Sequence, residues 1–311
     1  MLNYLLKGEK GTRLRFMGMF ISVLLISLSV FSLAEKGLNF GLDFTGGYLT
    51  QFTTNQSSEF SKIQAIISKN NSHEFELTAL GNHHFQVREA ASAKTKQVNT
   101  DWQSALMQNS DINAKILSST YIGSQVGDEL FDQGCLALFS SMIAVMIYLA
   151  LRFEWRLAVG SVVALIHDLI LVLGAFSFLQ LEFNLTVLAS LLAIIGYSLN
   201  DSIIVGDRVR ELLKIQHSPP MPPAKVINEA IKSTFTRTLI TSGTTLATVA
   251  SIWLLAGAAL QGFAIALFIG IVVGTFSSIC IAATLPELLG LSAKNYDKKV
   301  DAKTQTLLDM P

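Results

Sequence analysis

Long apolar runs separated by short polar connections occupy most of this chain. A helix needs about 20 predominantly apolar residues to cross a bilayer. Six runs are close to that length: Phe16–Ala34, Gly134–Leu151, Leu157–Leu179, Leu185–Val205, Thr238–Leu260 and Phe263–Leu285. The polar segment 35–130 separates the first run from the other five. The pattern predicts an all-α membrane protein with six transmembrane helices and a domain outside the membrane between helices 1 and 2.

The segment 35–130 has the pattern of a small α+β domain. Alternating apolar residues predict strands, and apolar residues three to four positions apart predict helices. In chain order the predicted elements are a strand at Tyr48–Thr53, a helix at Ser57–Lys69, strands at Glu74–Leu80 and Asn82–Glu89, a helix at Lys94–Gln108 and a strand at Asp111–Tyr121. This β-α-β-β-α-β order is ferredoxin-like. We interpret His73, His83 and His84 as surface residues, because they form no recognisable catalytic or zinc-binding set.

Composition supports the membrane assignment. Apolar residues make up 50% of the chain and charged residues 15%, against about 25% charged in ordinary soluble domains. These values disfavour a soluble enzyme, a disordered chain and a disulfide scaffold. The zero net charge gives no basic field for nucleic acid. Cys135 and Cys280 lie inside apolar runs, so we expect no disulfide and no metal site. No catalytic residues, enzymatic activity or cofactor are expected, because no nucleophile–base set or phosphate loop is present.

Basic residues occur in alternate connections between the runs. They are Lys7, Lys10, Arg13, Arg15, Arg152, Arg156, Arg208, Arg210, Lys214, Lys225, Lys232, Lys294, Lys298, Lys299 and Lys303. The connections Leu179–Asn184 and Gly257–Gly262 contain none. The positive-inside rule then predicts cytoplasmic termini and a periplasmic segment 35–130. The predicted organisation is a cytoplasmic N-terminus 1–15, helix 1 at 16–34, the periplasmic domain 35–130, helices 2–4 at 131–206, a cytoplasmic loop 207–236, helices 5–6 at 237–286 and a cytoplasmic tail 287–311.

The first run has a second interpretation. Its basic front and the sequence Ser32-Leu33-Ala34 resemble a secretory signal peptide with a small-residue cleavage site. The apolar run is longer than a usual signal-peptide core, which favours a membrane helix.

Three charged residues inside or beside the apolar runs are candidates for function. A charge in the bilayer core costs about 2.5–3.5 kcal/mol on insertion scales and therefore needs a reason. Asp201 lies late in the fourth run, and Arg237 precedes the fifth on the same predicted side, so the two can pair. Asp168 follows His167 near the middle of the third run. Because adjacent side chains diverge by about 100° on a helix, we do not expect these two to act on one point without the help of another group, although a relay role is open.

Each candidate also has a structural interpretation. Asp201 and Asp168 can be helix-packing residues, and Arg237 can extend to the lipid headgroups. The hydroxyl groups after Arg237, including those of Thr241 and Ser242, can hold a water chain or bond to their own backbone.

Several motifs resemble the SecD/SecF family. Gly41-Leu42-Asp43-Phe44-Thr45-Gly46-Gly47 is similar to the Gly-x-Asp-Phe-x-Gly-Gly signature of that family, in which Gly41, Asp43, Phe44, Gly46 and Gly47 are the matching positions. Segments that resemble the SecF members in particular are Leu151–Arg156, Ile166–Asp168, Gly196–Val205 and Arg237–Ser242. The resemblance covers about residues 11–290, in the family's order and spacing.

The resemblance implies a role in protein export across the bacterial inner membrane. Family members belong to the resistance-nodulation-division superfamily and use the proton gradient to promote late, periplasmic-side preprotein translocation. The implied partners are SecD in a heterocomplex, the SecYEG channel, YajC, the unfolded preprotein and the lipid bilayer. The family ties Asp201 and Arg237 to proton passage, and the candidate proton pathway also includes Asn200, Asp168, His167, Thr241 and Ser242.

Our hypothesis from the sequence is that protonation of Asp201 weakens its pairing with Arg237 and moves the periplasmic domain. Two alternatives remain. The chain can be a non-conducting structural subunit that stabilises SecD and the channel, or half of a small-molecule proton-coupled exporter.

Overall fold

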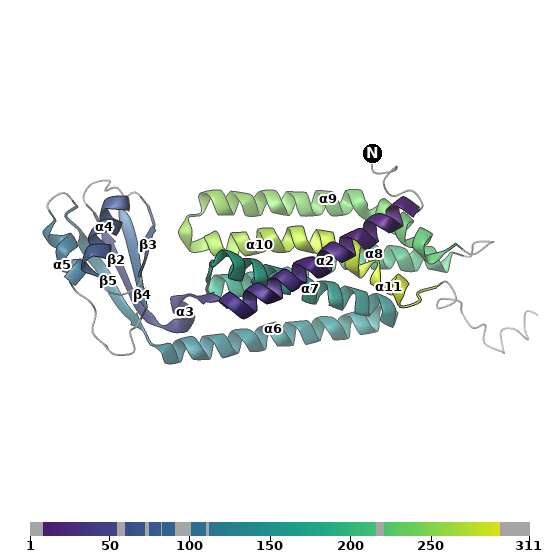
Figure 1. Ribbon diagram of the computed structural model, residues 1–311, viewed down its shortest axis with the longest axis horizontal. Coiled ribbons are helices and arrows are strands. Elements are labelled where there is room, and N and C mark those ends of the chain that lie inside the picture. The colour runs from purple at the N-terminus through teal and green to yellow at the C-terminus, as the bar shows by residue number, and fades with distance from the viewer. Residues whose placement is uncertain are drawn as a thin grey trace, which may run out of the picture.

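The computed structural model describes residues 9–54, 60–71, 75–81, 83–90, 101–109, 112–215 and 221–292. The molecule is elongated, with a small α/β domain at one end and a bundle of long helices at the other (Figure 1). Six helical segments are long and apolar enough to cross a membrane, which confirms the predicted fold class. They are α2 (Glu9–Lys36), α6 (Ser124–Arg152), α7 (Trp155–Leu179), α8 (Leu185–Lys214), α9 (Pro223–Leu255) and α10 (Ala258–Ser277), the last continued by the π-helix η1 (Ser278–Ala282) and α11 (Leu285–Leu288).

Local capping explains where the central helices begin and end. The Glu154 side chain accepts a hydrogen bond from the Arg156 backbone and starts α7, which ends at the left-handed residue Gln180. Asn184 caps α8 through Val187 N, and Pro223 occupies the first turn of α9. Helices α8 and α9 both extend past their apolar runs into segment 207–236, so much of that predicted loop is helical.

The extramembrane domain is a four-stranded antiparallel sheet with two helices. Its elements are β2 (Gly47–Thr53), α4 (Phe60–Asn70), β3 (Phe75–Ala79), β4 (His84–Ala90), α5 (Asp101–Gln108) and β5 (Lys115–Ile122). The strand order β3-β4-β2-β5 is that of the ferredoxin-like fold, as the sequence predicts. His83 and His84 are exposed, and His73 lies outside the described residues.

Apolar residues of alternate strand positions pack beneath α4 and α5. The Phe52 and Phe85 rings stack 5.6 Å apart, and Trp102 is fully buried beside them. The Trp102 indole N–H donates to Glu89 Oε1 at 3.0 Å, which satisfies the buried ring nitrogen. The opposite sheet face carries polar residues, among them Gln86 and Arg88, and lies over the domain-side end of the helix bundle.

Helices α7, α8 and α10 form the centre of the bundle, and α6 and α9 are largely exposed. Large apolar side chains such as Leu136 and Phe139 on α6 face outward, as lipid contact requires. Helix α2 packs along α7, where Ser32 and Ser177 hydroxyls lie 3.0 Å apart. This packing supports the interpretation of the first run as a membrane helix.

Two short strands join the domain to the bundle. Strand β1 (Asn39–Phe40), which follows α2, pairs in parallel with β6 (Glu182–Phe183), which lies between α7 and α8. The short helix α3 (Leu42–Thr45) follows β1 and leads into the sheet. The chain therefore enters the domain beside the beginning of α8.

Candidate proton site and the link to the extramembrane domain

Asp201 is buried among α8, α9 and α10. Its side chain is 2% exposed. The Ser242 hydroxyl on α9 donates to Asp201 Oδ2 at 3.3 Å and lies 2.8 Å from the Thr275 hydroxyl on α10. Asp201 Oδ1 has no hydrogen-bond partner among the described residues. The carboxyl group is therefore only partly satisfied by its surroundings.

The predicted pair between Asp201 and Arg237 is not formed as a direct contact. Arg237 is exposed and makes no ion pair within the described part of the chain, although its charge lies within electrostatic reach of Asp201. Helical geometry explains the difference. Thr238 and Ser242 lie one turn apart on the buried face of α9, and Arg237 is rotated from Thr238 by about 100°.

The other predicted neighbours of Asp201 divide between the interior and the surface. Ser242 contacts Asp201 directly. Thr241 is partly buried, and its hydroxyl donates to the backbone carbonyls of Arg237 and Thr238 in its own helix. Asn200 is exposed on the outer face of α8. Of these three residues, only Ser242 belongs to the cluster around Asp201.

Asp168 is the centre of a second buried cluster. His167 Nδ1 lies 2.8 Å from Asp168 Oδ1, so the two neighbours contact each other directly. Asp168 Oδ2 accepts hydrogen bonds from Ser198 on α8 at 2.5 Å and from Ser277 at the end of α10 at 2.9 Å. Both carboxylate oxygens are satisfied, and the aspartate joins three helices.

The two clusters share helices α8 and α10 and adjoin each other. Ser198 precedes Asp201 by about one turn of α8, and Thr275 and Ser277 are two residues apart on α10. Gly274 packs against the Asp168 cluster, where a Cβ atom would stand 3.3 Å from Ser198 Cβ and 3.4 Å from Asp168 Oδ2. Beyond Ser277 the chain changes to the π-helix η1, a local form that occurs often at functional sites.

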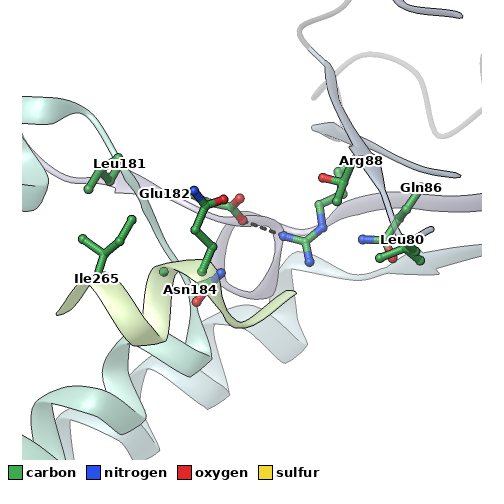
Figure 2. Close-up of a pocket in the computed structure, with 10 residues that line it drawn as sticks. Leu80, Gln86, Arg88, Leu181, Glu182, Asn184 and Ile265 are labelled. Carbon is green, nitrogen blue, oxygen red and sulfur yellow. Dashed lines mark hydrogen bonds and ion pairs between the residues drawn. The ribbon is translucent and has the colours of Figure 1, made fainter. Parts of the chain in front are cut away.

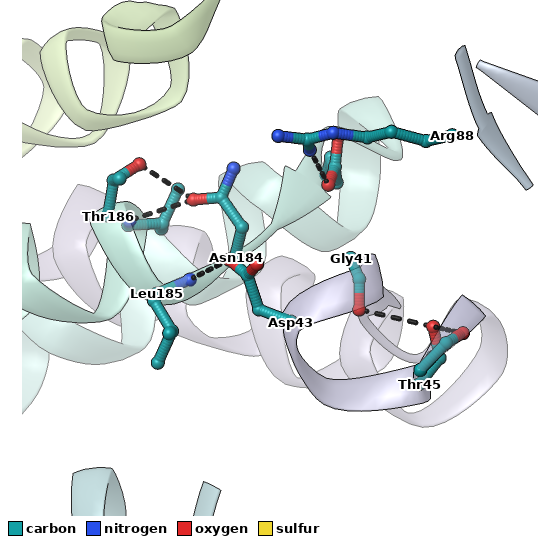
Figure 3. Close-up of polar contacts among 10 residues, drawn as sticks. Gly41, Asp43, Thr45, Arg88, Asn184, Leu185 and Thr186 are labelled. Carbon is teal, nitrogen blue, oxygen red and sulfur yellow. Dashed lines mark hydrogen bonds and ion pairs between the residues drawn. The ribbon is translucent and has the colours of Figure 1, made fainter. Parts of the chain in front are cut away.

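The Gly-x-Asp-Phe-x-Gly-Gly segment fastens the domain to the start of α8. Asp43 Oδ2 accepts a hydrogen bond from Leu185 N at 3.0 Å, beside the Asn184 cap of the same helix (Figure 3). The Gly41 N–H donates to the Phe183 carbonyl at 2.9 Å. Gly46 has a φ angle of 70°, which favours glycine where α3 turns into β2.

An aromatic cluster surrounds this fastening. The Phe44 ring stacks on Phe183 at 5.8 Å and meets Phe131 of α6 edge to face at 5.6 Å. A Cβ atom at Gly127 would collide with the Phe44 backbone carbonyl, so a glycine there lets α6 approach α3. We call α3 with its contacts to Phe183, Leu185 and α6 the clasp.

Two polar contacts between distant segments were not predicted from the sequence. Arg88 of β4 forms an ion pair with Glu182 of β6 at 2.8 Å. At the opposite end of the bundle, Arg15 is 1% exposed and bonds to Asn228, Thr284 and Glu287. The position of Arg15 at the edge of the first apolar run was a signal for burial, but no local pattern indicates its partners.

These features define a polytopic membrane protein whose ferredoxin-like domain is clasped to a helix bearing a buried acid. The family model of the protein export membrane protein SecD/SecF, C-terminal region, matches residues 102–291. The model of the SecD/SecF GG motif matches residues 31–57, which include the clasp sequence. The chain belongs to the SecD/SecF family of protein export membrane proteins.

Individual relatives place the chain among SecF subunits. The protein translocase subunit SecF of Vibrio alginolyticus is 38% identical over 277 residues, which cover 88% of this chain and 87% of that protein. The SecF subunit of Escherichia coli O157:H7 is 36% identical over 280 residues, with 88% and 86% covered.

Solved structures of SecDF share the fold. SecDF from Thermus thermophilus, a translocon-associated membrane protein, matches with a TM-score of 0.72 and 31% identity over 88% of this chain. SecDF in its Super-membrane-facing form matches with a TM-score of 0.69 and 30% identity over 95% of this chain. This chain spans 38% and 39% of those two SecDF chains, respectively.

Proposed function

We propose that this chain works with a SecD-type partner in the bacterial inner membrane to couple proton movement to the late, periplasmic-side stage of preprotein export. The observation that carries the proposal is the state of Asp201. It is 2% exposed within the bundle, and one of its two carboxylate oxygens lacks a hydrogen-bond partner among the described residues. An acid buried in a membrane bundle is costly and is characteristic of proton relays.

The contrast with Asp168 supports this choice of site. Asp168 has partners for both oxygens on three helices, so its role is to hold the bundle together. Asp201 has one donor, Ser242, and a more distant charge, Arg237. We therefore choose Asp201, rather than Asp168, as the group that gains and loses the proton.

Helix α8 links this site to the domain. Protonation of Asp201 removes a negative charge and with it the attraction to Arg237, so α8 and α9 shift relative to each other. At 1.5 Å per residue, the start of α8 lies about 24 Å from Asp201, and there Asp43 of the clasp accepts the Leu185 N–H. A shift of α8 therefore moves the base of the domain, as a two-state switch requires.

The charge distribution supports a periplasmic domain and cytoplasmic termini. Basic residues accompany the ends of the bundle remote from the domain, as in Arg152, Arg208 and Lys225, whereas the domain-side connection 257–262 has no charge. The proposed partners are SecD, the SecYEG channel, YajC and the unfolded preprotein. The proposal includes no enzymatic step, and protons are the coupling ion.

The test is preprotein export at a fixed proton gradient, in membranes with the SecD-type partner and the channel. We expect Asp201→Asn to abolish the gradient-dependent part of export. Asp207→Asn is the matched control, because it removes an acid from the same helix at the half-exposed pair with Arg152. Normal export with Asp201→Asn would refute the proposal.

A scaffolding subunit is the second candidate, and the Ser242–Asp201 bond between α8 and α9 favours it. In that case Asp201→Asn would weaken assembly with the partner and export would fall with or without a gradient. A proton-coupled small-molecule exporter would instead respond to Asp201→Asn in a drug-efflux assay while preprotein export stayed unchanged.

A further inference from the structure

The extramembrane domain contacts the domain-side end of the bundle at two places of different character. The first is the clasp, in which Phe44 is 7% exposed and Phe183 is 4% exposed. A backbone hydrogen bond also joins Gly41 to Phe183. Buried aromatic packing with backbone pairing makes the clasp a fixed attachment.

The second place is the ion pair between Arg88 and Glu182. Their side chains are 23% and 22% exposed, so the pair is partly buried but keeps some contact with water, unlike the aromatic core of the clasp. The two residues belong to elements far apart in the sequence, β4 of the sheet and β6 beside α8. Contacts of this kind break and re-form without disturbing a core, unlike those of the clasp.

A cavity of about 230 Å³, lined by both polar and apolar side chains, lies beside this pair (Figure 2). Gln86 and Thr78 line it from the open face of the sheet, and Gln261 and Asn184 line it from the ends of the bundle. The cavity separates the open face of the sheet from the ends of the bundle beside the clasp, since Glu182 and Asn184 of its lining flank Phe183. The domain therefore has room to tilt about the clasp when the ion pair opens.

The geometry points to Arg88 and Glu182 as a latch, a pair of positioning residues that holds the domain down over the bundle while the clasp serves as its hinge. Glu182 precedes α8 by three residues, so a shift of α8 acts on the latch and the hinge together. This inference rests on the proposed function, in which α8 carries the response to the proton. It adds the contact that must open for the domain to move.

Crosslinking across the cavity tests the latch. Thr78→Cys and Gln261→Cys place thiols on opposite walls, in a chain whose native Cys135 and Cys280 are replaced by alanine. The full chain, with its SecD-type partner in proteoliposomes and no gradient, is treated with a short bismaleimide. We expect Arg88→Glu to lower the crosslinking yield at least twofold, and the double variant Arg88→Glu/Glu182→Arg to restore it.

Two further variants keep the test decisive. Glu182→Gln removes the attraction without repulsion, so a reduced yield supports the latch even if the charge reversal fails to assemble. Arg208→Gln breaks an ion pair within α8, with Glu211, remote from the cavity, and should leave the yield unchanged. Wild-type yield in both Arg88→Glu and Glu182→Gln, or no recovery in the double variant, would overturn the latch.

A gradient separates this inference from the proposed function. Imposing a proton gradient should lower the crosslinking yield of the wild-type latch and leave that of Asp201→Asn unchanged. If the charge-reversal results hold but the gradient has no effect on the wild type, the latch stands and the proton coupling is wrong.

Discussion

Removal of the Asp168 carboxylate should destabilise the helix bundle but should not by itself stop proton movement. Asp168→Ala deprives His167, Ser198 and Ser277 of their shared acceptor. Hydrogen bonds between membrane helices contribute about 0.6 kcal/mol on average and about 1.7 kcal/mol at most. Two of the three lost bonds, those from Ser198 and Ser277, join helices, so they predict a decrease of about 1–3.5 kcal/mol in the free energy of unfolding.

The assay is equilibrium unfolding of the purified chain in mixed micelles by increasing SDS. Ser190→Ala is the control, because Ser190 is equally buried but donates only to Val187 of its own helix. We expect Ser190→Ala to lower the free energy of unfolding by less than about 1 kcal/mol. Wild-type stability of Asp168→Ala together with lost proton flux would refute the reasoning, since Asp168 would then belong to the relay.

Two other perturbations follow from the packing. Gly127→Val should disrupt the clasp, because its side chain would collide with the Phe44 carbonyl, and the yield of folded chain should therefore fall. A Cβ atom at Gly243 would meet nothing within 4 Å. Gly243→Ala should therefore leave the yield unchanged or raise the free energy of unfolding by about 0.5–1 kcal/mol. Arg15→Met should cost about 3 kcal/mol in SDS unfolding, the lower end for breaking a buried ion pair, because Glu287 is 19% exposed. Equal stability of Gly127→Val and Gly243→Ala, or an unaffected Arg15→Met, would contradict these assignments.

The fold follows from the sequence because its signals are local. The apolar runs and the strand alternation of segment 35–130 are properties of neighbouring residues, so they predict the helices and the β-α-β-β-α-β order. The ends of α8 and α9 are less predictable, since helical structure continues to Lys214 and resumes at Pro223 among polar residues. Hydropathy predicts which residues lie in the membrane, whereas capping and packing determine where each helix begins and ends.

The candidate site is only partly predictable for the same reason. In the sequence Asp168 and Asp201 are both acids within apolar runs. The two acids differ only in their three-dimensional surroundings. Ser277 donates a hydrogen bond to Asp168, whereas Arg237 is exposed and does not contact Asp201. The Arg88–Glu182 pair joins positions 94 residues apart, and no periodicity carries that information.

Proton flux through Asp201 is the central claim. The most direct measurement is the gradient-driven acidification of proteoliposomes that contain this chain and its SecD-type partner, compared among wild type, Asp201→Asn and Asp207→Asn. The account predicts that Asp201→Asn reduces the flux to the level of protein-free vesicles, whereas Asp207→Asn retains it. Wild-type flux with Asp201→Asn in a correctly assembled complex would contradict the account.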